Sequence, residues 1–130
     1  MSWTNTAHPA VASAHKEESW LKQASILVLA AQGTHADATQ FNKDVRESRA
    51  QLRGYMQQAR KTRLSKEHRQ LHSTMVLLDV LLKSAAACQT AGYIVCPPLL
   101  MIQLKTVLKN AYANLENFKQ TLNKTNTGTS

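Results

Sequence analysis

The feature that most constrains this chain is an alternating three- and four-residue spacing of apolar residues, which recurs in four separate segments. Such spacing places side chains on one face of an α-helix. Each apolar face must be covered by another helix, so the pattern predicts an all-α protein built as a four-helix bundle. The four stripes are Trp20, Leu21, Ala24, Leu27, Val28 and Ala31; Phe41, Val45, Ser48, Leu52, Tyr55 and Ala59; Leu64, His68, Leu71, Met75, Leu78, Leu82 and Ala85; and Leu100, Leu104, Val107, Leu108, Ala111, Leu115, Phe118 and Leu122.

Length and connections narrow this prediction to a simple arrangement. A chain of 130 residues suits one domain, and the short segments between the stripes favour antiparallel, up-and-down packing. We expect residues 1–12 to be a flexible N-terminal segment, residues 13–122 to form the bundle, and residues 123–130 to be a disordered polar tail.

Helix ends can be placed from capping residues and helix breakers. Ser13 fits the N-cap of the first helix, because the two glutamates at 17–18 would then lie near its positive end. Gly33 and Gly92 suit the ends of the first and third helices. Pro98 suits the first turn of the fourth helix, where no amide hydrogen is needed.

The junction between the second and third helices has no strong breaker. Ser65 could cap a separate third helix, but the two helices could also fuse, and a second chain would then complete the bundle. We expect a break, because a rod from residue 37 to 91 would lack an internal partner. A second apolar strip predicts that the third helix is the most buried. That strip comprises Val76, Leu77, Val80, Leu81 and Cys88.

Positive charge is concentrated in one part of the chain. The net charge is +8, and the 27 residues from Lys43 to Arg69 hold nine Lys and Arg against three carboxylates, which leaves +6 there. Helical spacing would gather several of these side chains into a ridge, which could bind carboxylates or phosphates. The predicted binding residues are Lys43, Arg46, Arg49, Arg53, Arg60, Lys61, Arg63 and Lys66.

These patterns favour an interaction module over an enzyme. The sequence has no Ser/His/Asp order, no phosphate-binding glycine loop and no convincing carboxylate pair, so we expect neither catalysis nor a cofactor. We expect an adaptor or subunit that binds an acidic protein partner through an apolar groove flanked by the basic ridge. The alternative is a nucleic-acid-binding bundle that uses the same ridge, and a homodimer is compatible with either interpretation.

Histidine offers two further patterns. His68 and His72 are four residues apart and could share a metal, but no third ligand is clearly placed. We therefore expect no metal site, with one histidine part-buried and the other at the surface. The run from Arg63 to His68 also resembles the R-x4-H motif of HEPN-type ribonucleases, although Leu64 replaces the usual polar residue. That resemblance would imply that Arg63 and His68 act at a scissile phosphate in a dimer cleft.

Hydropathy and the two cysteines provide predictions about the cellular compartment of the protein. No segment approaches the roughly 20 apolar residues of a membrane span. The apolar run at 26–31 follows two glutamates, whereas a secretory signal carries positive charge there. We therefore expect a cytoplasmic protein without a membrane span. Cys88 and Cys96 are expected to be free thiols, with a disulfide in an oxidising compartment as the alternative.

Overall fold

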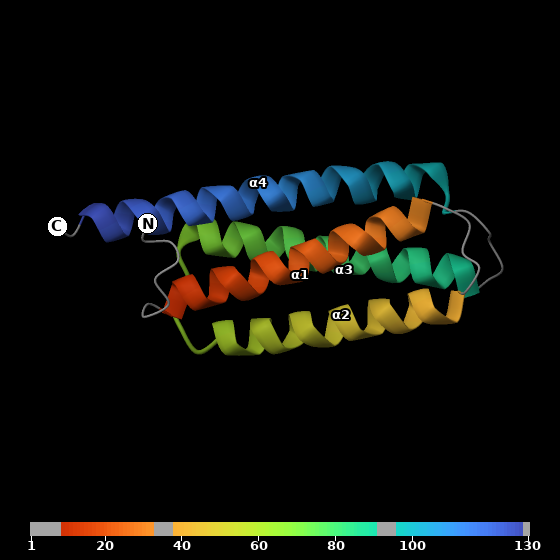
Figure 1. Ribbon diagram of the computed structural model, residues 1–130, viewed down its shortest axis with the longest axis horizontal. Helices are drawn as coiled ribbons and strands as arrows, with labels where there is room; N and C mark the ends of the chain where they lie inside the picture. The colour runs from red at the N-terminus through yellow and green to blue at the C-terminus, as the bar shows by residue number, and fades with distance from the viewer. Residues whose placement is uncertain (1–8, 33–37, 91–95, 129–130) are drawn as a thin grey trace.

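The computed structural model describes residues 9–32, 38–90 and 96–128, and they form four helices (Figure 1). The helices are α1 (Pro9–Gln32), α2 (Ala38–Ala59), α3 (Lys66–Thr90) and α4 (Pro98–Gly128). Successive helices run in opposite directions, and α4 returns to the end of the bundle at which α1 begins (Figure 1). Both α1 and α3 pack against α2 and α4, and α1 also contacts α3. The predicted antiparallel four-helix bundle is confirmed.

The predicted apolar stripes supply the core. Every residue of the α1 stripe is buried, and so are most residues of the other three. Trp20 and Phe118 are the largest fully buried side chains. Small residues such as Ala24 and Ala111 are fully buried as well. Aliphatic and aromatic side chains from all four helices thus form one continuous core.

Two helices are longer than their stripes indicated. We expected residues 9–12 to precede the first helix, but α1 begins at Pro9 and Val11 is fully buried. The reason is that proline suits the first helical position, so Pro9 starts the helix and Ser13 lies inside it rather than capping it. At the other end, α4 continues past its last buried residue, Leu122, to Gly128. The predicted polar tail is therefore largely helical.

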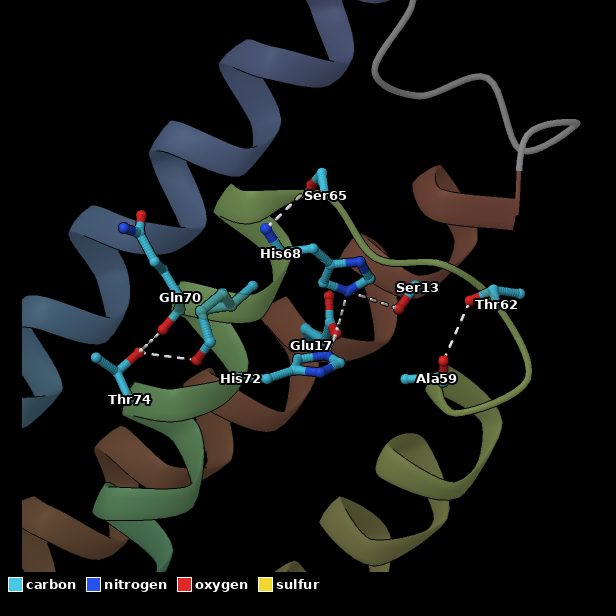
Figure 2. A network of polar contacts seen from close by, with 10 residues as sticks. Ser13, Glu17, Ala59, Thr62, Ser65, His68, Gln70, His72 and Thr74 are labelled. Atoms are coloured by element: carbon cyan, nitrogen blue, oxygen red, sulfur yellow. Dashed lines mark hydrogen bonds and ion pairs between the residues drawn. The ribbon is translucent and has the colours of Figure 1, made fainter.

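The predicted break between α2 and α3 is confirmed. The backbone N–H of His68 donates to Ser65 Oγ at 3.1 Å, which makes Ser65 the N-cap of α3. Thr62 Oγ1 donates to the carbonyl of Ala59 at 3.2 Å and closes the end of α2 (Figure 2). The four-helix bundle is complete within one chain. The predicted stop glycines, Gly33 and Gly92, lie outside the described residues.

The second apolar strip of α3 predicted that this helix is the most buried. Leu81 and Cys88 of that strip are only partly buried and its other three residues are exposed, although α3 does contact all three other helices. Val76, Leu77 and Val80 are 45%, 48% and 49% exposed, because no other described helix covers that face. The two strips together also make residues 66–89 long and apolar enough to cross a membrane by length and composition. This is weak evidence for a span, because the core helix of a bundle meets the same criteria.

The two cysteines near the α3–α4 connection are free thiols, as the sequence predicted. Cys96 is buried and Cys88 is partly buried. Burial, and to a lesser extent the neighbouring Cys88, raise the pKa of the Cys96 thiol. A raised pKa keeps this thiol protonated and unreactive at neutral pH. In the first turns of α4, which follow Cys96, Leu99 and Ile102 are exposed.

Candidate functional site

A basic groove lies along the seam between the C-terminal half of α2 and the N-terminal half of α3. Its volume is about 570 Å³. It is lined by apolar Met56, Ala59, Leu64 and Val76, by Arg60, Arg63 and Arg69, and by Thr62 and His72. None of these described lining residues carries a carboxylate, so the groove combines apolar surface with uncompensated positive charge.

Antiparallel packing brings these residues together from two helices. Arg49 and Met56 are seven residues apart and share the side of α2 that faces α3, and Arg60 follows directly after the end of the helix. On α3, Asp79 and Val76 are three apart and share one face. The ion pair between Arg49 Nε and Asp79 Oδ2, at 3.3 Å, ties the two helices together beyond the groove.

The predicted basic residues divide into two groups. Arg60 and Arg63, on the turn between α2 and α3, line the groove together with Arg69 from α3. The structure does not bring the others into the groove lining. Of these, Arg49 is half-buried in its ion pair with Asp79, and the rest are exposed: Lys43, Arg46 and Arg53 on α2, Lys61 on the turn, and Lys66 at the start of α3.

We expect Arg49 to stabilise the bundle rather than to bind a partner protein. Replacing it with leucine leaves the buried Asp79 carboxylate unpaired, so the free energy of unfolding should fall by about 1–3 kcal/mol. The same replacement at exposed Arg46 should change it by no more than about 0.5 kcal/mol. Urea unfolding followed by circular dichroism measures both, and equal losses in the two variants would contradict a structural role for Arg49.

A cluster of three buried ionisable side chains lies beside the groove. Glu17 from α1 and His68 and His72 from α3 are 0%, 4% and 7% exposed. Glu17 Oε2 accepts from His68 Nε2 at 2.7 Å and also contacts His72 Nε2. Figure 2 shows the carboxylate of Glu17 directed toward both imidazole rings. The expectation that one histidine would lie at the surface is wrong, since both are buried.

Three further contacts position His68. Its ring stacks on Phe118 of α4, with ring centroids 4.1 Å apart and planes 18° apart. Ser13 Oγ lies 3.3 Å from His68 Nε2 (Figure 2). The backbone N–H of His68 also donates to the N-cap Ser65 Oγ, which fixes the position of the His68 backbone and so where its ring enters the core. Groups from α1, from the turn before α3 and from α4 therefore hold this imidazole in one orientation.

The electrostatics of the cluster favour an ionised Glu17. Burial by itself raises the pKa of this carboxyl, but hydrogen bonds from His68 and His72, together with their positive charge when protonated, outweigh it. The pKa therefore lies below its ordinary value of 4.5. Glu17 Oε2 contacts the Nε2 atoms of both histidines. The other carboxylate oxygen, Oε1, has no hydrogen-bond partner among the described residues.

Glu17 is the residue that sequence reasoning placed wrongly. We expected it near the positive end of the first helix, but that helix begins eight residues earlier, at Pro9. The spacing indicated that Glu17 is buried. It precedes Trp20 and Leu21 by three and four residues, and so it lies on the apolar face of α1. A carboxylate on such a face requires buried partners. The His68–His72 pair supplies them and, with Glu17, presents ligand atoms within 4.8 Å of one another.

Arg63 and His68 both border a second cavity, of about 630 Å³, at the end of the bundle that holds the N-terminus of α1. Arg63 is exposed there, whereas His68 Nε2 is directed to Glu17 and Ser13 in the interior. The R-x4-H motif thus combines one surface residue and one core residue. No protein-family model, curated protein or solved structure matches this chain.

Proposed function

We propose that this chain is a non-enzymatic interaction module that binds an acidic, amphipathic helix of a protein partner in the basic groove. The observation that carries this proposal is the composition of the groove, in which three arginines surround apolar side chains with no carboxylate among the described lining residues. Apolar surface favours a partner that buries side chains, and the arginines favour one that carries carboxylates.

The exposed face of α3 extends the apolar part of the groove. Val76 lines the groove, and Leu77 and Val80 continue from it along the same helix. From Arg69 to Val80 this surface spans about 16 Å at the rise of an α-helix. That length accommodates a helix that presents apolar residues at positions i, i+3, i+4 and i+7, the usual mode of helix-in-groove recognition.

Nucleic acid fits this surface less well. Phosphates would use the arginines, but they gain nothing from the exposed Val76, Leu77 and Val80. Single-stranded nucleic acid is commonly held by stacking on aromatic rings, and none of the described residues that line the groove is Phe, Tyr or Trp. A helix with acidic flanks uses both the charged and the apolar components.

A binding experiment separates these outcomes. The probe is a labelled helical peptide of about 20 residues, or about 30 Å, with leucines on one face and glutamates elsewhere. We expect saturable binding that weakens by about tenfold when Arg60 and Arg69 are both replaced by glutamate, since reversal turns each attraction into a repulsion. Fluorescence anisotropy measures the affinity at low and physiological salt.

Two controls make the result specific. Replacing Lys105 and Lys109 of α4 by glutamate changes the net charge equally, but neither residue lines the groove, so binding should be retained. A scrambled peptide of the same charge should bind more weakly, because its leucines no longer share one face. Equal loss in both double variants, equal binding of the scrambled peptide, or tighter binding of RNA or DNA would overturn the proposal.

A further inference from the structure

The interior of the bundle contains a cluster of three ionisable side chains, of which only His72 also lines the groove. Two imidazole nitrogens, His68 Nε2 and His72 Nε2, approach the same oxygen of Glu17. The three donor atoms come from two helices and lie within 4.8 Å of one another. Two histidines one helical turn apart, joined by a carboxylate from a second helix, form a three-ligand set of the type that holds zinc in proteins.

A second observation points to a ligand at this position. Glu17 is fully buried, yet its Oε1 has no hydrogen-bond partner among the described residues. Leaving a carboxylate oxygen unsatisfied in a core is costly, and such groups call for a bound ion or water. The convergence of both histidines on Oε2, and the unsatisfied Oε1, are both explained by a cation bound between the three side chains.

We propose that Glu17, His68 and His72 bind one divalent transition-metal ion, with Zn²⁺ as the ion best suited to the donor set. Imidazole nitrogen and carboxylate oxygen suit zinc, whose usual coordination number of four leaves one further position. Ser13 Oγ, 3.3 Å from His68 Nε2, is near enough for its hydroxyl, or a water held by it, to complete the set.

The surroundings suit a metal site in two respects. Stacking on Phe118 and the Ser65 cap hold His68 in position before an ion binds. The entropic cost of ordering this side chain on metal binding is therefore small. His68 also borders the cavity at the end of the bundle, and His72 borders the basic groove. An ion therefore has a route to these buried ligands without unfolding of the bundle.

The test begins with wild-type protein stripped of metal by a chelator. Calorimetric titration with ZnCl₂ should show one ion bound per chain, and saturation should raise the melting temperature by about 5 °C or more. Long-range ¹H–¹⁵N spectra of the imidazole rings should show the Nε2 resonances of His68 and His72 shifting on addition of zinc. The ring of His15, which lies outside the cluster, should not respond in this way.

Variants then assign the ligands. His72→Gln and Glu17→Gln should each weaken zinc binding by at least about tenfold, since even outer-shell changes cost this much. The matched changes His15→Gln and Glu18→Gln should retain the wild-type affinity. Absence of saturable binding by the wild type, undiminished binding by folded His72→Gln, or zinc-induced shifts confined to other histidines would overturn the proposal. If a variant does not fold, the imidazole spectra of the wild type show whether zinc binds His68 and His72.

Discussion

Replacing Trp20 with alanine is expected to lower the free energy of unfolding by about 3–5 kcal/mol, a large part of the total stability of a domain this size. Trp20 is the largest of the fully buried side chains, so its removal leaves a cavity that neighbouring side chains fill only partly. It also links α1 to α2, because its Nε1–H donates to the carbonyl of Ser48 at 2.8 Å. Urea unfolding followed by circular dichroism measures the loss.

Trp20→Phe separates the two contributions. Phenylalanine keeps most of the apolar volume but cannot donate to the Ser48 carbonyl, so this variant should lose only about 1–2 kcal/mol. Ile26→Ala on the exposed face of the same helix serves as a control and should change stability little. A loss in Trp20→Ala no larger than in Ile26→Ala would show that Trp20 is not in the core.

Glu17→Ala is expected to destabilise the metal-free protein by about 3–5 kcal/mol, as measured in the presence of a chelator. The physical reason is that the substitution leaves His68 and His72 buried without their shared acceptor. Both imidazoles are more than nine-tenths buried, and the His68 ring is stacked on Phe118. The expected cost is thus a desolvation cost, and not only the loss of two hydrogen bonds.

The neighbouring glutamate provides a matched control. Glu18 Oε2 accepts from Lys119 Nζ at 2.8 Å in a partly exposed ion pair between α1 and α4. Such pairs contribute about 0–1 kcal/mol, so Glu18→Ala should have a much smaller effect than Glu17→Ala. Equal losses in the two variants would contradict the placement of Glu17 in a buried cluster.

The sequence predicted the architecture because four stripes at helical spacing leave few ways to bury them. Two residues of the first helix, Pro9 and Glu17, were nevertheless placed wrongly from the sequence. Pro9 falls in the segment predicted to be flexible, although the argument that places Pro98 at the start of α4 applies equally to Pro9. Because α1 starts at Pro9, Glu17 lies in the third turn of the helix and on the face that joins the core.

The candidate site was only partly predictable. Charge density indicated the basic stretch, but not which arginines would line a groove and which would pair internally. That division depends on how α2 is aligned against α3. The alignment places Arg49 beside Asp79 and brings both Arg60 and Arg69 into the groove lining. Likewise, the meeting of Glu17 with His68 and His72 joins residues more than 50 positions apart. Spacing within one helix carries no information about such a contact.

The groove and the buried cluster share one residue. His72 lines the groove on one side and contacts Glu17 on the other. The exposed surface that we propose for partner binding and the interior site that we propose for a metal ion are therefore adjacent, although each can be tested alone. Zinc binding without peptide binding, or the reverse, would leave one proposal standing and remove the other.

The most direct test of the proposed function is to map peptide binding on ¹⁵N-labelled protein by changes in amide chemical shift. The acidic amphipathic peptide should shift the amides of the groove and of the adjoining face of α3, and should leave the exposed face of α4 around Lys105 and Lys109 unchanged. The residues expected to respond are Met56, Ala59, Arg60, Leu64, Arg69, Val76, Leu77 and Val80. Shifts confined to other helices, or no shifts at saturating peptide, would contradict the assignment of this groove as the binding site.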